Sequence, residues 1–257
     1  MIKLNLASPQ ARGLVSFIAP SYSSAVIADV ARGGALMRTV ARGGGSLPTL
    51  VGSALGGWGT LFQSQDHYYT DAAFTGIPAA ANATIVQWVY IPDTSRLGVF
   101  VKVGGGTSGF GLGVGATQTN NSGNNLVGIY EFVRYIASGV AIGTGWHLCG
   151  MTVNASGFPT LYLDGRSVYS DTSGTPSAPS AGINVGYSGS INGLPPSGCG
   201  FLHGLTYNRA LSDAEMRALY DPQTRWDLYY VPGRRVYFDL GATPTGRTSR
   251  LSLVGVA

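Results

Sequence analysis

Short runs of apolar, β-branched and aromatic residues recur along most of the chain, and each run is bounded by Gly, Pro, Asn or Ser. Runs of about four to eight such residues between turn formers are typical of strands in antiparallel sandwiches and barrels. From residue 58 onward the pattern is regular. It predicts strands within seven ranges: 84–91, 96–104, 109–116, 126–137, 145–155, 159–170 and 181–189.

Two of these ranges carry a more specific signal. Asp164-Gly165 lies between TLYL and RSVY, and an Asp-Gly pair between apolar runs is the strongest local indication of a β-hairpin. GLGVGA at 111–116 fits a loose Gly-x-Gly-x-x-Ala pattern, but the polar TQTNNSGNN that follows cannot begin the helix that a phosphate-binding loop requires. We therefore expect these glycines to let strands, or a neighbouring chain, approach closely.

One stretch near the C-terminal end has the pattern of a helix. In YNRALSDAEMRALYDP, residues 207–222, Ser212 is a good N-cap and Glu215 stands three positions later, so each side chain can bond the other's backbone amide. Pro222 ends the helix, because the residue before a proline is driven out of helical geometry. The sequence predicts a helix at 212–220 that covers the sandwich with an apolar stripe made of Leu211, Met216, Leu219 and Tyr220.

Composition supports one all-β domain with extensions. The chain of 257 residues has 39 glycines, 44% hydrophobic residues and 11% charged residues. It is too apolar for a disordered chain and too poor in helix formers for a helical bundle, whereas all-β domains often reach about 200 to 250 residues. We expect an N-terminal arm at 1–11, a sandwich over 12–222 and a C-terminal extension at 223–257.

Charge and hydropathy exclude some partners. The net charge is only +4, and Lys3 and Lys102 are the only lysines, whereas nucleic-acid binding usually needs clustered Lys and Arg. No run of about 20 apolar residues is present, and a polar break at 8–10 interrupts any secretory signal. We expect no membrane partner, no specific nucleic-acid partner and folding in a cytoplasm, where Cys149 and Cys199 remain free thiols more readily than they form a disulfide.

Three segments in sequence order resemble a known family. They are similar to the Trp-His strand with its Leu-Tyr-Leu-Asp-Gly hairpin, to the short strand that follows, and to the Asn-Arg-Ala-Leu-Ser ending of laminin-G-like, concanavalin A-like domains. The three segments are GWHLCGMTVNASGFPTLYLDGRSVYS, INVGYS and GFLHGLTYNRALSDAEMRALYDP. The resemblance is specific over 145–222 and weak over 12–140. It implies an antiparallel jelly-roll sandwich in which the Trp-His strand packs structurally.

The family's fold is shared by many glycosidases, yet no catalytic constellation stands out. Hydrolysis of a glycosidic bond normally uses two carboxyl groups about 5 to 10 Å apart. The chain has two glutamates: Glu215 belongs to the predicted helix cap, and we expect Glu131 to be a polar residue that faces outward. His147 and Cys149 share one strand face, without an activating third group. We therefore expect no enzyme and no cofactor, although a carboxylate pair assembled from distant Asp residues stays open. The remaining histidines are His67 and His203.

Calcium and sugar binding are weaker possibilities. Asp66, Asp71 or Asp171 could supply calcium ligands, as in some laminin-G-like domains, but no dense Asp/Asn loop with calcium-type spacing exists, so we assign no metal site. A sugar would need an exposed aromatic platform, whereas aromatic residues within strands are usually buried. The candidates are the fourteen tyrosines together with Trp58, Trp88, Trp146 and Trp226.

The C-terminal extension carries too many aromatic and apolar residues for a free disordered tail. Its Trp-x-Leu continuation and arginine-rich segment are similar to laminin-G-like proteins among tailed-phage structural genes. This resemblance favours a non-enzymatic virion protein, a capsid decoration, cement or fibre component assembled in the host cytoplasm. It would form a homo-oligomer and contact capsid or tail subunits through Arg234, Arg235, Tyr237 and Phe238. The alternative is a carbohydrate-binding, lectin-like module on a phage or cell surface.

Overall fold

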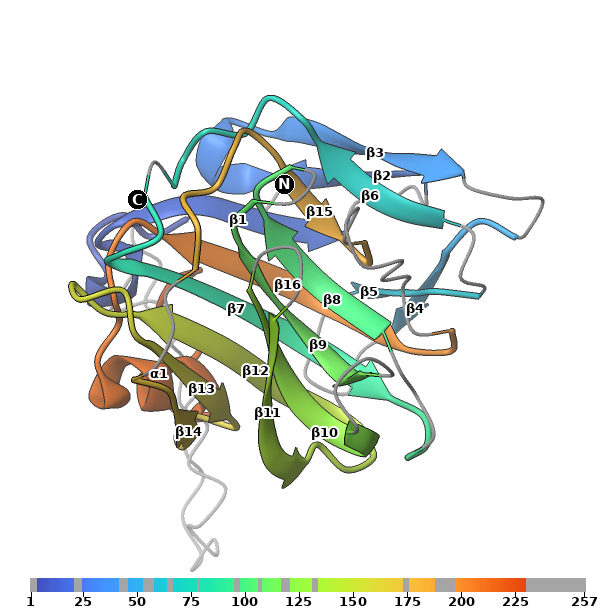
Figure 1. Ribbon diagram of the computed structural model, residues 1–257. Coiled ribbons are helices and arrows are strands. Elements are labelled where there is room, and N and C mark those ends of the chain that lie inside the picture. Colours follow the sequence, from blue (N-terminus) through green and yellow to red (C-terminus); the bar gives the residue numbers. More distant parts are fainter. Residues whose placement is uncertain are drawn as a thin grey trace, which may run out of the picture.

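The computed structural model describes residues 4–20, 25–41, 46–52, 58–63, 67–77, 79–94, 98–105, 108–116, 121–130, 134–172, 176–187 and 197–229 (Figure 1). Over these ranges the chain is all-β with a short α-helix and two single-turn 3₁₀ helices, which confirms the predicted fold class. The 3₁₀ helices are η1 (Pro9–Ala11) and η2 (Val30–Arg32). The strands are β1 (Leu14–Pro20), β2 (Val26–Asp29), β3 (Ala35–Ala41), β4 (Thr49–Gly52), β5 (Trp58–Leu61), β6 (His67–Asp71), β7 (Ala83–Ile91), β8 (Gly98–Val103), β9 (Phe110–Ala116), β10 (Asn121–Tyr130), β11 (Arg134–Ala141), β12 (Gly145–Val153), β13 (Pro159–Leu163), β14 (Arg166–Ser170), β15 (Ile183–Val185) and β16 (Gly200–Tyr207).

The strands form one antiparallel path that folds back on itself. Its order is β11-β10-β9-β8-β15-β6-β3-β2-β1-β16-β7-β12-β13-β14, and β5 joins β4 to β16 beside this path. Strands from opposite ends of the path meet face to face, since β10 contacts β13 and β11 contacts β14. The result is the two-layered, nearly closed sandwich of a jelly roll (Figure 1).

Alternation along the strands separates two hydrophobic clusters. On β7, Ile85 and Val89 face the main core between the layers. Val86 and Trp88 point the other way, into a second cluster on the outer face of the sheet. Both faces of β7 are therefore covered, which explains why its sequence is an almost continuous apolar run.

Helix α1 (Asp213–Tyr220) covers this second cluster, as predicted. Its capping box is complete: Ser212 Oγ accepts from the amide of Glu215, and the Glu215 carboxylate accepts from the amide of Ser212. Tyr220 stacks on Trp88 with ring centres 5.8 Å apart. A Cβ at Gly150 on β12 would lie 2.3 Å from the Met216 methyl group, so this glycine lets the helix rest directly on the sheet.

The hairpin turn predicted at Asp164-Gly165 and the close strand approach predicted for the glycines at 111–116 are also confirmed. Asp164 and Gly165 both have positive φ, +52° and +75°, as a tight hairpin turn between β13 and β14 requires. On β9, a Cβ at Gly111 would lie 2.6 Å from the carbonyl oxygen of Val101, and a Cβ at Gly113 would lie 2.5 Å from that of Gly98. These glycines let β9 approach β8 closely.

The described parts of the two terminal segments lie against the sandwich and against each other. The amide of Asn5 donates to the carbonyl oxygen of Leu228 at 2.7 Å, and Leu228 is buried in the second cluster. Cys149 and Cys199 are both buried, and no disulfide joins them. Among the described residues, no helix is long and apolar enough to cross a membrane.

Candidate functional site

Several residues that the sequence singles out cannot be placed. Arg234, Arg235, Tyr237 and Phe238 lie outside the described residues, as do Glu131 and Asp66. The strands that carry Trp58 and His67 are described, but their side chains are not. The predicted tail contacts therefore stay a prediction.

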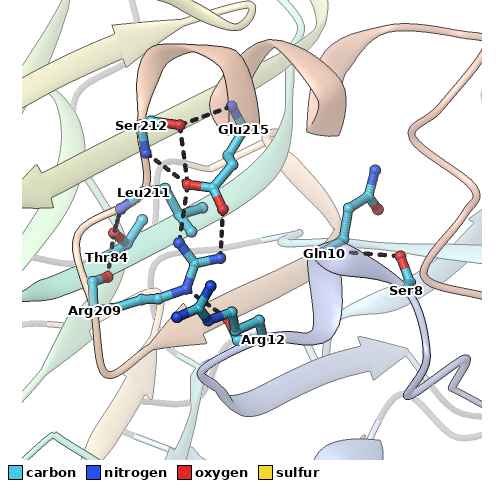
Figure 2. A network of polar contacts seen from close by, with 8 residues as sticks. All are labelled: Ser8, Gln10, Arg12, Thr84, Arg209, Leu211, Ser212 and Glu215. Atoms are coloured by element: carbon cyan, nitrogen blue, oxygen red, sulfur yellow. Dashed lines mark hydrogen bonds and ion pairs between the residues drawn. The ribbon is translucent and has the colours of Figure 1, made fainter.

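Glu215 is fixed in a structural role. Its carboxylate pairs with Arg209, with Oε1 2.7 Å from Nη2 and Oε2 2.9 Å from Nη1 (Figure 2). Hydrogen bonding from Arg209 holds the pKa of Glu215 down at about 2. A carboxyl group with so low a pKa cannot serve as a general acid near neutral pH.

His147 and Cys149 occupy different surroundings, and His147 is held by hydrogen bonds to Asp164 and Thr144. His147 Nδ1 lies 2.9 Å from Asp164 Oδ2, and Nε2 lies 3.2 Å from the carbonyl oxygen of Thr144. Hydrogen bonding to Asp164 raises the pKa of His147. Cys149 is fully buried, and burial raises the pKa of its thiol well above the usual value, so the reactive thiolate is disfavoured. Asp164 also accepts from the amide of Leu148. Its hydrogen bonds to His147 and Leu148 hold the β13–β14 turn against β12.

Of the calcium candidates, Asp71 and Asp171 are described, and both lie within the protein's own contacts. Asp71 pairs with Arg32 and caps the amide of Ala73, and Asp171 is buried. In the part of the chain that the structure describes, no group of three His, Cys, Asp or Glu side chains is placed to hold a metal ion.

Three tryptophans pack against the sheet. Trp88 is buried beneath Tyr220. Trp226 packs against His203 and Tyr229, with ring centres 6.5 Å and 5.6 Å away. Trp146 is half-buried beside Tyr90 at 5.6 Å. Trp88 is buried, and Trp146 and Trp226 are partly exposed.

A different set of residues forms an accessible aromatic and polar surface, which we call the β3–β6–β15 patch. Arg38 on β3 lies opposite Thr70 on β6, and Thr70 lies opposite Asn184 on β15. The three side chains therefore share one row and one face of the sheet. Tyr68 lies two positions before Thr70 and shares this face. The intervening Tyr69 points into the main core.

The patch is completed by Tyr187, which follows β15 and stacks on Tyr68. The ring centres are 4.2 Å apart and the ring planes differ by 23°. Arg38 is exposed, and the other four residues are partly exposed. Within the described residues, the side chains of Arg38, Thr70 and Asn184 make no hydrogen bond or ion pair. An amide, a hydroxyl and a guanidinium group thus stand beside an aromatic stack with their hydrogen-bonding capacity available to a ligand.

Such a surface is chemically suited to carbohydrates. The C–H face of a sugar ring packs on an aromatic ring, and its hydroxyl groups pair with amide, hydroxyl and guanidinium groups. No local pattern in the sequence identifies this patch. The alternation of HYYTD indicates that Tyr68 and Thr70 face away from Tyr69, but nothing local shows that residues 183–185 pair with residues 69–71.

Comparison with known proteins supports the fold. No family model matches the chain, and no curated protein matches it. Among solved structures, it is similar to the binding domain of Paraclostridial Mosquitocidal Protein 1, with 15% identity and a TM-score of 0.60 over 83% of this chain and 53% of that one. It is also similar to the receptor-binding domain of botulinum neurotoxin type G, with 14% identity and a TM-score of 0.55 over 82% of this chain and 51% of that one.

A third solved structure matches along nearly its whole length. Domain 4 of AbnA, an extracellular GH43 arabinanase from Geobacillus stearothermophilus, was solved in complex with arabinotriose. It shares 13% identity and a TM-score of 0.59, over 81% of this chain and 98% of that one. The chain thus spans about half the length of the two toxin domains and almost all of the arabinanase domain. These neighbours share an all-β architecture, and the two toxin domains are binding domains.

Proposed function

We propose that this chain is a carbohydrate-binding domain that holds its glycan on the β3–β6–β15 patch. The observation that carries the proposal is the Tyr68–Tyr187 stack, which stands on the same face as Asn184 and Thr70. Support also comes from the fold, because a domain that matches this chain along 98% of its own length, with a TM-score of 0.59, was solved in complex with arabinotriose.

The patch binds without cleaving. Its five residues, Arg38, Tyr68, Thr70, Asn184 and Tyr187, include no carboxyl group, whereas the usual hydrolysis of a glycosidic bond requires two. One sugar ring packs against the tyrosine stack, and Asn184 and Thr70 bond its hydroxyl groups and fix its orientation. Arg38, the exposed member of the row, adds a hydrogen-bonding fork for a neighbouring sugar unit.

The proposal is tested by glycan binding to the full chain and to matched variants. A glycan array that includes arabino-oligosaccharides identifies a ligand, and isothermal titration calorimetry then compares Tyr187→Ala and Asn184→Ala with the unaltered chain. Loss of an aromatic anchor typically costs about 2 kcal/mol, which is about 30-fold in affinity. Tyr169→Ala is the control, since Tyr169 is exposed on β14, away from the patch.

Two results would overturn the proposal. One is an array on which the folded full chain binds no glycan. The other is a bound glycan whose affinity Tyr187→Ala and Asn184→Ala lower no more than Tyr169→Ala does.

The virion role favoured by the sequence stays a prediction. Neither the comparisons with family models and curated proteins nor the similar solved structures bear on it. It is compatible with glycan binding, because a particle that displays many copies sums weak contacts into strong attachment. Mass spectrometry of purified phage particles tests it, and the expected result is a stoichiometric amount of this chain.

A further inference from the structure

The β3–β6–β15 patch carries a positive charge that no carboxylate of the patch balances. Arg38 is exposed, and within the described residues its guanidinium makes no ion pair. The carboxylate that follows Thr70 in the sequence belongs to Asp71, which pairs with Arg32 and caps the amide of Ala73. The charge of Arg38 is therefore available to a ligand.

A second basic residue lies in the same row of side chains. Lys102 on β8 is directly opposite Asn184, so it continues the row that contains Arg38. Lys102 is buried, and its ammonium nitrogen donates to the carbonyl oxygen of Gly104 at 3.3 Å. Burial lowers the pKa of Lys102 to about 8, which still leaves it mostly protonated at neutral pH. Two of the four residues in this row are basic and none is acidic, which favours an anionic ligand over a cationic one.

Arg38 is placed to contact a glycan that packs on the tyrosine stack. On the neighbouring strands β3 and β6, Arg38 pairs with Thr70, and Tyr68 lies two positions before Thr70. Arg38 is therefore a diagonal neighbour of Tyr68, and such neighbours are about 7 to 8 Å apart, within reach of long side chains. A glycan on the stack can place a substituent of its next sugar unit at the guanidinium.

The chemistry of the guanidinium favours a carboxylate as that substituent. Arginine presents five N–H donors in a planar fork and accepts no hydrogen bond. A carboxylate accepts two parallel hydrogen bonds from this fork and neutralises its charge, whereas a sugar hydroxyl leaves the charge unbalanced. Thr70 and Asn184 can both donate and accept, so they suit the hydroxyl groups of the same glycan.

We infer that the glycan held by the β3–β6–β15 patch is acidic and contains a uronic-acid unit, whose carboxylate pairs with Arg38. This inference rests on the proposed function, because it requires a glycan on the patch. It adds that charge selects among glycans: the tyrosine stack and Asn184 hold a sugar of either kind, and Arg38 favours the acidic one.

Matched probes separate the charge of the ligand from the identity of its sugar. They are trimers of galacturonic acid and of glucuronic acid, each used beside its neutral methyl ester. Each probe is titrated into the ¹⁵N-labelled full chain and followed by NMR at the side-chain amide of Asn184. In at least one pair the acid should bind about threefold to fivefold more tightly than the ester, the scale of a partly exposed charge pair. This preference should shrink in about 0.5 M NaCl, because salt screens exposed charges.

Substitutions of Arg38 test whether this side chain causes the preference. Arg38→Gln still bonds hydroxyl groups but has no charge, so it should bind acid and ester equally. Arg38→Lys keeps the charge without the planar fork and should retain only part of the preference. Tyr187→Ala should weaken acid and ester alike. Arg166→Gln is the matched control, since Arg166 is exposed on β14, and it should behave like the unaltered chain.

The outcomes distinguish this inference from the proposed function. If a neutral glycan such as arabinotriose binds through Tyr187 and Asn184 while neither acid is preferred to its ester, the inference is overturned and the glycan-binding role stands. It is also overturned if Arg38→Gln prefers the acid as strongly as the unaltered chain does, or if a sulfated oligosaccharide binds more tightly than both uronic acids. If no glycan binds at all, both proposals fail.

Discussion

His203 is an ionisable residue that the fold keeps neutral. It lies on β16, with its ring centre 5.6 Å from that of Phe17 and 5.5 Å from that of Tyr229. Burial, together with the charge of Arg225, lowers the pKa of His203 to about 3. The folded protein therefore excludes a proton that the unfolded chain takes up below about pH 6.5.

This difference predicts a pH-dependent stability. As the pH falls from about 6.5 to about 3, the unfolded state gains a proton on residue 203 that the folded state does not, so the free energy of unfolding falls by up to about 1.4 kcal/mol per pH unit. His203→Gln should remove this part of the slope. Urea unfolding at several pH values between 7 and 4 measures it, and an unchanged slope in the variant would contradict the buried, neutral state of His203.

His147 is the natural control for this experiment because its pKa is shifted the other way. Hydrogen bonding to Asp164 raises its pKa, so its contribution is fully present below the unfolded pKa and is lost as the pH rises through the folded pKa. His147→Gln should therefore leave the loss of stability on acidification at least as steep as in the unaltered chain.

At the scale of elements, strand β9 depends on having no side chains on one face. A Cβ at Gly111 would meet a backbone carbonyl oxygen at 2.6 Å, and backbone in a paired strand cannot move aside cheaply. We expect Gly111→Ala to lower the free energy of unfolding by about 1 to 3 kcal/mol. Gly128 on β10 is the control: a Cβ there would meet the end of the Leu161 side chain at 3.0 Å, which can shift, so Gly128→Ala should cost less. Urea unfolding compares the two, and equal costs would contradict the close backbone approach.

The features that the sequence predicted are those set by neighbouring residues. Ser212 and Glu215 are three positions apart and specify the start of the helix, and Asp164-Gly165 specifies a turn by its own backbone preferences. Sheet order is different, because β15 lies between β6 and β8, and its residues 183–185 pair with segments distant in sequence on both sides. The patch made by Tyr68, Asn184 and Tyr187 depends on that pairing, so local reasoning could not assemble it.

At the scale of the whole molecule, the two described ends act as one cover over the second hydrophobic cluster. Gln10 reaches Thr224, Asn5 reaches Leu228, and Leu228 is 1% exposed beside Phe17 and Tyr229. The described beginning of the extension, residues 223–229, thus contributes to the packing of the sandwich. The remaining residues, 230–257, are where the predicted assembly contacts fall.

This division separates two effects of shortening the chain. A chain that ends at Asp221 loses Trp226, Leu228 and Tyr229, and it should be at least about 2 kcal/mol less stable, because burial of one large apolar side chain contributes about 1.5 to 3 kcal/mol. A chain that ends at Tyr229 keeps these residues and should unfold at nearly the same urea concentration as the full chain, after allowance for any oligomer. If the two shortened chains proved equally stable, the packing of residues 223–229 would contribute nothing to the fold.

The chain ending at Tyr229 also tests the predicted homo-oligomer without disturbing the sandwich. Apolar and aromatic residues continue beyond Tyr229, including Tyr237 and Phe238 next to Arg234 and Arg235, and such residues are favoured in contacts between proteins. If they join subunits, light scattering after size-exclusion chromatography should give a defined oligomer for the full chain and a monomer for the shortened one. Glycan affinity per monomer should be equal in the two, since the β3–β6–β15 patch is intact in both, whereas binding to a glycan-coated surface should be stronger for the oligomer. A monomeric full chain would refute the assembly role of this segment and leave the glycan-binding proposal untouched.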